Sequence, residues 1–216
     1  MKDRKTAFQA AALWAGMMTA YLAAGLAERF LVDVSLVIWV NIILTILCFI
    51  LAARGKDGVR SLGMVRERFA LSFLAGLACS AAIVIINAVI PGILGGMGMA
   101  EPGTLLIQFV YFMAVIAIPE EIIFRGYILS RMEQSSERKY AGVVISGIMF
   151  MLIHLPYQAV MNGGLLPLIL NGYGVTLIMT FVWHIVFCIL LKKTGAIYGA
   201  ILFHAVMNWS NYLFVP

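Results

Sequence analysis

The chain has 216 residues, of which 63% are hydrophobic, and fifteen Lys and Arg against ten Asp and Glu give it a formal net charge of +5. A water-soluble domain of this length would need much more polar surface, so the composition excludes a soluble fold. The positive charge does not indicate nucleic-acid binding, because the basic residues lie in short connections between long apolar runs. The composition predicts an integral membrane protein surrounded by the lipid bilayer.

Seven apolar segments follow one another, most of them close to the roughly 20 residues that a membrane-spanning helix needs. We therefore expect an all-α fold, a polytopic transmembrane helical bundle with about seven membrane segments. The fifth segment is short and is expected to end at Pro156. The expected bounds are 7–27, 34–53, 69–90, 104–130, 140–156, 165–191 and 194–214.

The basic residues predict how these segments are oriented. Thirteen of the fifteen Lys and Arg lie before the first segment or in the second, fourth and sixth connections. Arg29 lies in the opposite set of connections, and Arg125 lies within a segment. Cytoplasmic connections carry an excess of Lys and Arg. We expect a cytoplasmic N-terminus, an external C-terminus and a location in the plasma membrane.

Isolated polar residues mark the second and third segments. Asn41 and Asn87 are expected to make hydrogen bonds between helices. Cys48, Cys79 and Cys188 stand singly in apolar segments, so neither a disulfide framework nor a thiolate metal site is predicted.

The fourth segment contains the most informative residues of the chain. Glu120, Glu121 and Arg125 interrupt a long apolar stretch, and an ionised group at this depth costs about 2.5–3.5 kcal/mol by insertion scales. Such groups face a protein interior and mark functional sites. Glu121 and Arg125 are four residues apart and are expected to pair, whereas Glu120 points about 100° away and is left for chemistry.

Two histidines on other segments are expected to reach a similar depth. Counting from the cytoplasmic ends places Glu120 and His204 roughly 16 Å deep and His154 roughly 22 Å deep, at 1.5 Å rise per residue. His204 and Asn208 share a helix face. Gly199 lies beside this face and allows a neighbouring helix to approach closely. We therefore expect these polar groups to converge.

The convergent groups allow two routes to amide hydrolysis. Glu120 beside the His154 imidazole can act as a general base that activates water, and His204 with Asn208 can donate hydrogen bonds to an oxyanion. Alternatively, Glu120, His154 and His204 are a ligand set for a catalytic divalent metal such as zinc. The sequence leaves both routes open.

Three motifs in this order resemble the CPBP family of intramembrane proteases. That family groups type II CAAX prenyl proteases with bacteriocin-processing and self-immunity (Abi) membrane proteins. The resemblance covers roughly residues 104–212. The motifs are Glu120-Glu121-xxx-Arg125, Phe150-xxx-His154 and His204-xxx-Asn208.

The resemblance implies a role for each of these residues. Glu120 would be the water-activating base, assisted by His154, with His204 and Asn208 at the oxyanion. Glu121 and Arg125 would support the site, and Phe150 would form a wall beside His154. Family members are often called metalloproteases, and a metal-free glutamate mechanism is also proposed for them, so the cofactor stays open.

The resulting prediction is an intramembrane endopeptidase with two parts. Residues 1–103 would form N-terminal transmembrane helices, and residues 104–216 a CAAX-protease-like catalytic transmembrane core. The substrate would be a membrane-embedded or lipid-anchored protein or peptide, cleaved near the cytoplasmic half of the bilayer. CAAX-type processing and bacteriocin or peptide maturation with self-immunity are the two processes implied.

Two alternatives come from other classes of protein. A proton-coupled transporter would use the carboxylates and histidines as a relay, although no inverted repeat is visible. A non-catalytic immunity or scaffold protein would bind a peptide in the same cavity. His184 belongs to none of the motifs and is expected to be structural, with a substrate contact as the minority interpretation.

Overall fold

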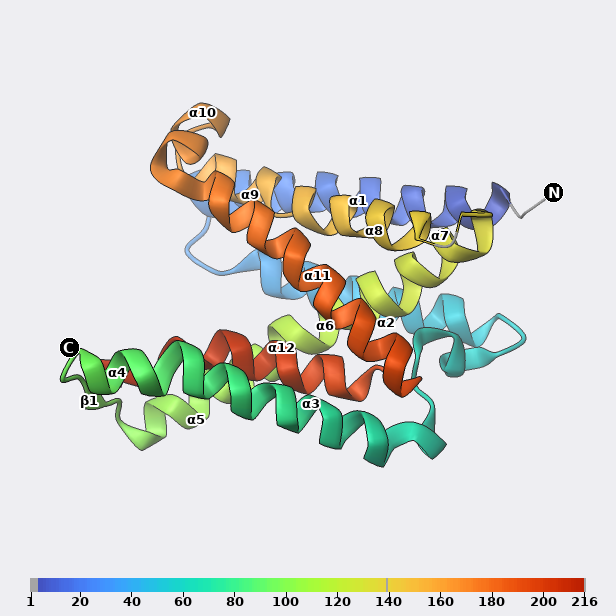
Figure 1. Cartoon of the computed structure of the whole chain (residues 1–216). Helices are drawn as coiled ribbons and strands as arrows, with labels where there is room; N and C mark the ends of the chain where they lie inside the picture. The colour runs from blue at the N-terminus through green and yellow to red at the C-terminus, as the bar shows by residue number, and fades with distance from the viewer. Residues whose placement is uncertain (1–3, 139, 216) are drawn as a thin grey trace.

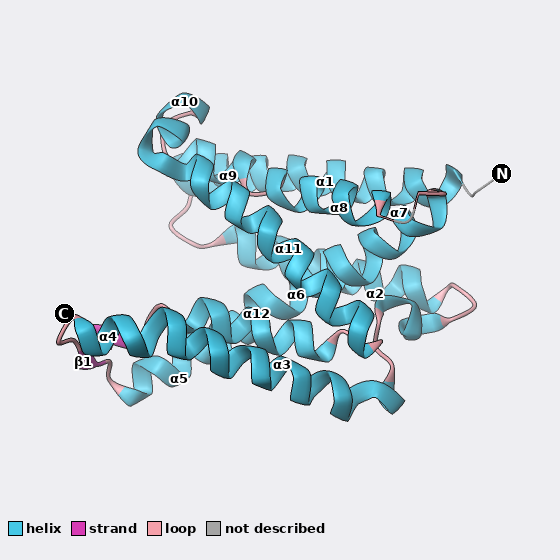
Figure 2. Cartoon of the chain, in the orientation of Figure 1, coloured by secondary structure: helices cyan, strands magenta, loops and turns pink. Residues whose placement is uncertain are grey.

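The computed structural model describes residues 4–138 and 140–215, which fold into a bundle of helices (Figures 1 and 2). Six stretches of helix in these residues are long and apolar enough to cross a membrane. They are Arg4–Phe30, Leu36–Ala53, Arg66–Leu94, Pro102–Ser135, Ala141–Met161 and Leu165–Thr194. The all-α polytopic bundle predicted from the sequence is confirmed.

The seventh predicted segment is helix α12 (Tyr198–Ser210), which has only thirteen residues. Most of its central residues are buried, among them Phe203, Ala205 and Val206. Because α12 is surrounded by other helices rather than by lipid, the roughly 20 residues needed to span a bilayer do not limit its length.

The first half of the chain contains two long helices, a set of short turns and a third interrupted helix. The elements are α1 (Arg4–Phe30), α2 (Leu36–Ala53), η1 (Gly58–Leu62), η2 (Arg66–Arg68), α3 (Phe69–Val84), η3 (Ile85–Val89), α4 (Ile90–Leu94) and β1 (Gly98–Met99).

The second half contains the predicted site residues. Its elements are α5 (Pro102–Tyr111), η4 (Phe112–Ala117), α6 (Ile118–Glu120), η5 (Glu121–Leu129), α7 (Ser130–Ser135), α8 (Ala141–Leu152), α9 (Leu155–Met161), α10 (Leu165–Leu168), η6 (Ile169–Tyr173), α11 (Gly174–Thr194), α12 and β2 (Phe214–Val215). The two short strands pair antiparallel, with Gly98 opposite Val215.

Most helix ends that carry basic residues lie together, and Arg29 at the end of α1 is the exception. Figure 1 shows the N-terminus, the turn after α2 and α7 at one end of the bundle, and the C-terminus, β1 and α10 at the other. We call the first of these the basic end. Helix α11 crosses the bundle obliquely between the two ends (Figure 1).

Helices α3 and α12 pack with their backbones in close approach. A Cβ added to Gly76 would lie 2.5 Å from the Cα of Gly199, and one added to Gly199 would meet the carbonyl oxygen of Ser72. The Ser72 hydroxyl also accepts a hydrogen bond from the Gly199 N–H at 2.8 Å, which satisfies an otherwise unpaired donor in the first turn of α12. The close packing expected at Gly199 is therefore present.

Two prolines shape the helices that present the site. Pro156 lies in the first turn of α9, where a missing N–H costs little, so the fifth segment continues to Met161 instead of ending at Pro156 as predicted. Pro119 lies within α6, between the π-helical stretches η4 and η5. Interruptions of this kind are frequent at functional sites.

Candidate functional site

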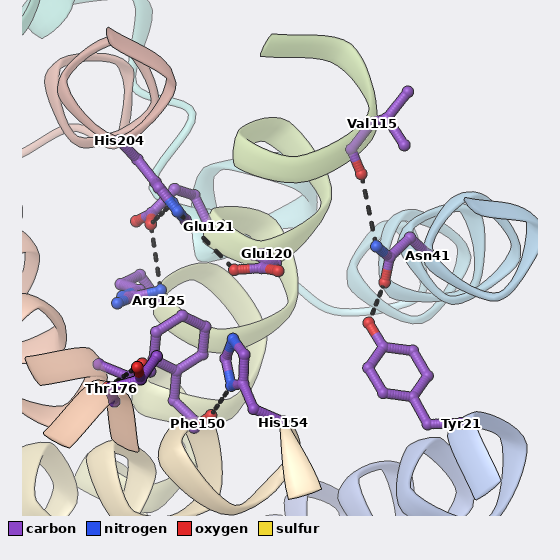
Figure 3. A network of polar contacts seen from close by, with 11 residues as sticks. Tyr21, Asn41, Val115, Glu120, Glu121, Arg125, Phe150, His154, Thr176 and His204 are labelled. Atoms are coloured by element: carbon purple, nitrogen blue, oxygen red, sulfur yellow. Dashed lines mark hydrogen bonds and ion pairs between the residues drawn. The ribbon is translucent and has the colours of Figure 1, made fainter. Parts of the chain in front are cut away.

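Glu120 occupies the last position of α6, directly after Pro119. Its side chain retains 13% exposure, whereas the side chain of the neighbouring Glu121 is fully buried. The adjacent carboxylates thus lie in different surroundings, as their helical offset predicted. Figure 3 shows Glu120 pointing into the space between His204 and His154.

His204 lies between the two carboxylates. Its Nδ1 donates a hydrogen bond to Glu121 Oε1 at 2.9 Å, and its Nε2 lies 3.8 Å from Glu120 Oε2. The imidazole stacks on the Phe187 ring with centroids 4.9 Å apart, which fixes its plane. Because Nδ1 is committed to Glu121, Nε2 is the nitrogen available to the cavity.

Glu121 and Arg125 form the predicted ion pair across one helical turn. Arg125 Nη1 lies 3.1 Å from Glu121 Oε1, and both side chains are fully buried. The guanidinium also lies over the Phe150 ring, 4.1 Å from its centroid. The hydrogen bond from His204 to Glu121 was not predicted. Glu121 is therefore the point where α12 is held against η5.

His154 lies at the junction of α8 and α9. Its Nδ1 donates to the carbonyl oxygen of Phe150 at 2.8 Å. A carbonyl only accepts, so in the neutral ring Nε2 carries the lone pair. Figure 3 shows this second nitrogen on the side of Glu120. Phe150 packs edge-on against His154 at 5.1 Å and forms the predicted wall.

A cavity of about 570 Å³ brings the predicted residues together. Its lining includes Glu120, Phe150, His154, His204 and Asn208. Glu121 and Arg125 do not line it; they lie behind His204. We call this space the large cavity. It is of the size that binding sites for small molecules or short peptides have.

The large cavity extends away from the basic end of the bundle. Beyond Glu120 and His204 it is lined by Asn87, Val175 and Asn211, which lie near the opposite ends of their helices.

A second, smaller cavity of about 230 Å³ lies on the other side of Glu120. It shares Ile116, Glu120 and His154 with the large cavity, and its other walls come mainly from α1, α2 and α9. We call it the small cavity. Two spaces therefore meet at the carboxylate expected to activate water.

The arrangement of His and carboxylate side chains bears on whether the site could hold a divalent metal. No group of three His, Cys, Asp or Glu side chains in residues 4–138 and 140–215 is placed to hold a metal ion. Glu120 Oε2 and His204 Nε2 lie 3.8 Å apart, and they supply at most two ligands. A zinc site usually needs at least three protein ligands.

His184 is fully buried beside the site. Its Nε2 lies 3.0 Å from Ser146 Oγ and 3.3 Å from Cys188 Sγ. It does not line the large cavity, and its partners are side chains of α8 and α11. These contacts agree with the structural role expected from the sequence.

Several residues that line the large cavity were not predicted as part of the site. Asn87 was assigned to a hydrogen bond between helices, yet it faces the cavity. On α11, Thr176, Thr180 and Trp183 follow one another at helical spacing and form another wall. A polar stripe on the sixth segment was the available signal, but its direction depended on the tertiary packing.

The comparison with protein families gives one match. Residues 102–210, just over half of the 216, match the model for "Type II CAAX prenyl endopeptidase Rce1-like". The match runs from the first residue of α5 to the last residue of α12. The division of the chain into parts at residues 103 and 104 stays a prediction.

Comparisons with curated proteins and with solved structures give no match. The family match contains all three motifs, and with them the predicted residues that line the large cavity. This chain belongs to the Rce1-like family of type II CAAX prenyl endopeptidases.

Proposed function

We propose that the chain is an intramembrane endopeptidase that uses Glu120 to activate water. The family match supports protease activity in general. Together with six helices long and apolar enough to cross a membrane, it supports action in a lipid bilayer on a membrane-associated substrate. The observation that best supports this mechanism is that one cavity is lined by Glu120, His154, His204 and Asn208.

In the proposed step, Glu120 takes a proton from water while the water oxygen attacks the scissile carbonyl carbon. The carbonyl oxygen becomes an oxyanion that accepts hydrogen bonds from the Asn208 amide and from His204 Nε2, which carries a hydrogen when the ring is doubly protonated, since Nδ1–H is donated to Glu121. The carbon–nitrogen bond then breaks, and the proton passes to the departing amine, with His154 Nε2 placed to relay it. The products are a carboxylate and an amine.

We propose that Glu121 and Arg125 act by holding His204. The Glu121 carboxylate receives the Nδ1–H, and Arg125 compensates its charge in the fully buried interior. We also propose that this step uses no bound metal. The support is that the described residues include no group of three His, Cys, Asp or Glu side chains placed to hold a metal ion.

For the substrate, the family name points to prenylated peptides of the CAAX type. A membrane-embedded peptide, as in bacteriocin maturation or self-immunity, is the other class that fits a cavity inside the bundle. A chain that carries its own hydrophobic anchor would reach this cavity from within the membrane.

We propose that the N-terminus lies in the cytoplasm, in the plasma membrane. The support is the collection of basic helix ends on one end of the bundle (Figure 1). With this orientation the large cavity extends toward the external side, so the substrate would approach from the outer half of the membrane.

The test is cleavage in proteoliposomes that contain the purified chain. A prenylated CAAX peptide, the same peptide without the prenyl group and a membrane-spanning peptide are followed by mass spectrometry. We expect Glu120→Gln to lower the cleavage rate by about 100-fold or more, because general-base catalysis contributes that much. Glu137→Gln, an exposed carboxylate, is the matched control and should cleave normally.

Four outcomes would contradict the proposal. Cleavage by Glu120→Gln at the wild-type rate would remove the assigned base. Loss of cleavage on adding a chelator, with recovery on adding zinc, would contradict the metal-free step. Proton uptake without peptide cleavage by the wild type would favour the transporter, and peptide binding without cleavage would favour the scaffold protein.

A further inference from the structure

The small cavity is built in part by helices that the family match does not include. Tyr21 of α1 and Asn41 of α2 form part of its wall, whereas the match begins at Pro102. Both side chains are buried, with 7% and 1% of their surfaces exposed. The N-terminal helices thus place polar groups in the small cavity, on the side of Glu120 that faces away from the large cavity.

The two cavities approach Glu120 from different sides. Only Ile116, Glu120 and His154 belong to both. His204 and Asn208, the groups assigned to the oxyanion, belong to the large cavity alone. A peptide that places its carbonyl between these two groups therefore occupies the large cavity and leaves the small cavity open.

The lining of the small cavity suits water. Its walls include the polar side chains of Ser35, Tyr111, Tyr157 and Gln158, in addition to the Tyr21–Asn41 pair. Its volume of about 230 Å³ corresponds to roughly eight water molecules at about 30 Å³ each. Ser35 is exposed at the turn before α2, which gives the cavity a connection to the surface.

Two hydrogen bonds connect the wall of this cavity to the helix backbone just before Glu120. The Tyr21 hydroxyl donates to Asn41 Oδ1 at 2.5 Å, and Asn41 Nδ2 donates to the carbonyl of Val115 at 3.4 Å (Figure 3). Pro119 has no N–H to donate to the carbonyl four residues before it, which is that of Val115. Asn41 therefore bonds to a carbonyl, five residues before Glu120, that receives no hydrogen bond from Pro119.

We propose that the small cavity is the compartment that supplies the hydrolytic water to Glu120 while a peptide fills the large cavity. Tyr21 and Asn41 are positioning residues that keep this compartment open and aligned with Glu120. This inference rests on the proposed function, since it concerns the water consumed in that reaction.

The experiment makes the same type of substitution, Val to Phe, separately in each cavity. Val37→Phe adds bulk to the small cavity, and Val175→Phe adds it to the large cavity. We expect Val37→Phe to lower kcat by at least about tenfold with peptide Kd unchanged. The added ring would displace the water from Glu120, and a displacement of reacting groups by about 1 Å can already lower a rate about 100-fold. Val175→Phe should instead raise peptide Kd and KM. Turnover and equilibrium peptide binding are measured on both full-length variants.

A reversible block tests the same inference on folded protein. Gln158→Cys is treated with a bulky, water-soluble methanethiosulfonate and afterwards with a reducing agent, with the wild type treated in parallel because Cys79 is partly exposed. We expect kcat to fall on modification and to return on reduction, with peptide Kd constant. A structural defect of the variant would not be reversed by reduction.

The inference fails if Val37→Phe folds and turns over like the wild type, or if the modified Gln158→Cys protein keeps its kcat. It also fails if either change raises peptide Kd as Val175→Phe does, because the small cavity would then bind peptide. A wild-type protein that cleaves no peptide would instead overturn the proposed function.

Discussion

His204 connects the two carboxylates that the sequence places side by side. It donates to Glu121 through Nδ1 and faces Glu120 through Nε2, so one imidazole joins the buried ion pair to the cavity. The pairing of Glu121 with Arg125 was predictable because residues four apart share a helix face. The contact of His204 with Glu121 was not, since it depends on how α12 docks on η5, and helical spacing does not give docking angles.

Removing one partner of the buried ion pair should destabilise the protein. Arg125→Met leaves the Glu121 carboxylate buried beside His204 without its counter-ion, and we expect a loss of about 3–5 kcal/mol in unfolding free energy. The double variant with Glu121→Gln should recover part of this, because no uncompensated charge remains. Thermal unfolding of the purified variants in detergent measures both. A double variant no more stable than Arg125→Met would refute this explanation.

At the scale of elements, the contact between α3 and α12 sets the position of His204 and Asn208. The sequence indicated a close approach at Gly199, and the structure places Gly76 and Ser72 against it. The end of the fifth segment was predicted too early, because Pro156 was taken as a helix end rather than as a residue of the first turn of a new helix. His154 owes its place at the α8–α9 junction to this restart.

A methyl group at Gly199 should separate α3 from α12. We expect Gly199→Ala to cost about 1–3 kcal/mol, as overpacking of a close contact does, and to reduce cleavage because His204 lies on the displaced helix. Gly16→Ala is the matched control: nothing lies within 4 Å of the added Cβ on α1, so stability should rise slightly or stay constant. Equal effects of the two substitutions on thermal stability and cleavage would show that the approach of α3 and α12 is unimportant.

For the molecule as a whole, the sequence predicted the class of fold, the number of segments and the residues that converge. Apolar length and the cost of buried charge are properties of single segments, so they can be evaluated without a structure. The two cavities could not be predicted in this way. Residues such as Asn87, Thr176 and Tyr21 line the cavities because helices distant in sequence pack together. Within its own segment, each is only a polar residue among apolar ones.

The proposed orientation predicts which turns are accessible from outside an intact cell. Asp33→Cys lies between α1 and α2, and Asp57→Cys lies in the turn after α2 at the basic end; both positions are exposed. A membrane-impermeant maleimide should label the first in intact cells and the second only after permeabilisation, because basic connections are retained in the cytoplasm. The wild type, with its natural cysteines, is the background control. The reverse pattern would turn the large cavity toward the cytoplasm.

The most direct test of the central claim is single-turnover cleavage of a membrane-anchored peptide in proteoliposomes, measured with peptide binding for the wild type and Glu120→Gln. The claim predicts that both proteins bind the peptide with the same Kd and that only the wild type forms the carboxylate and amine products. Product formed by Glu120→Gln at the wild-type rate would contradict it.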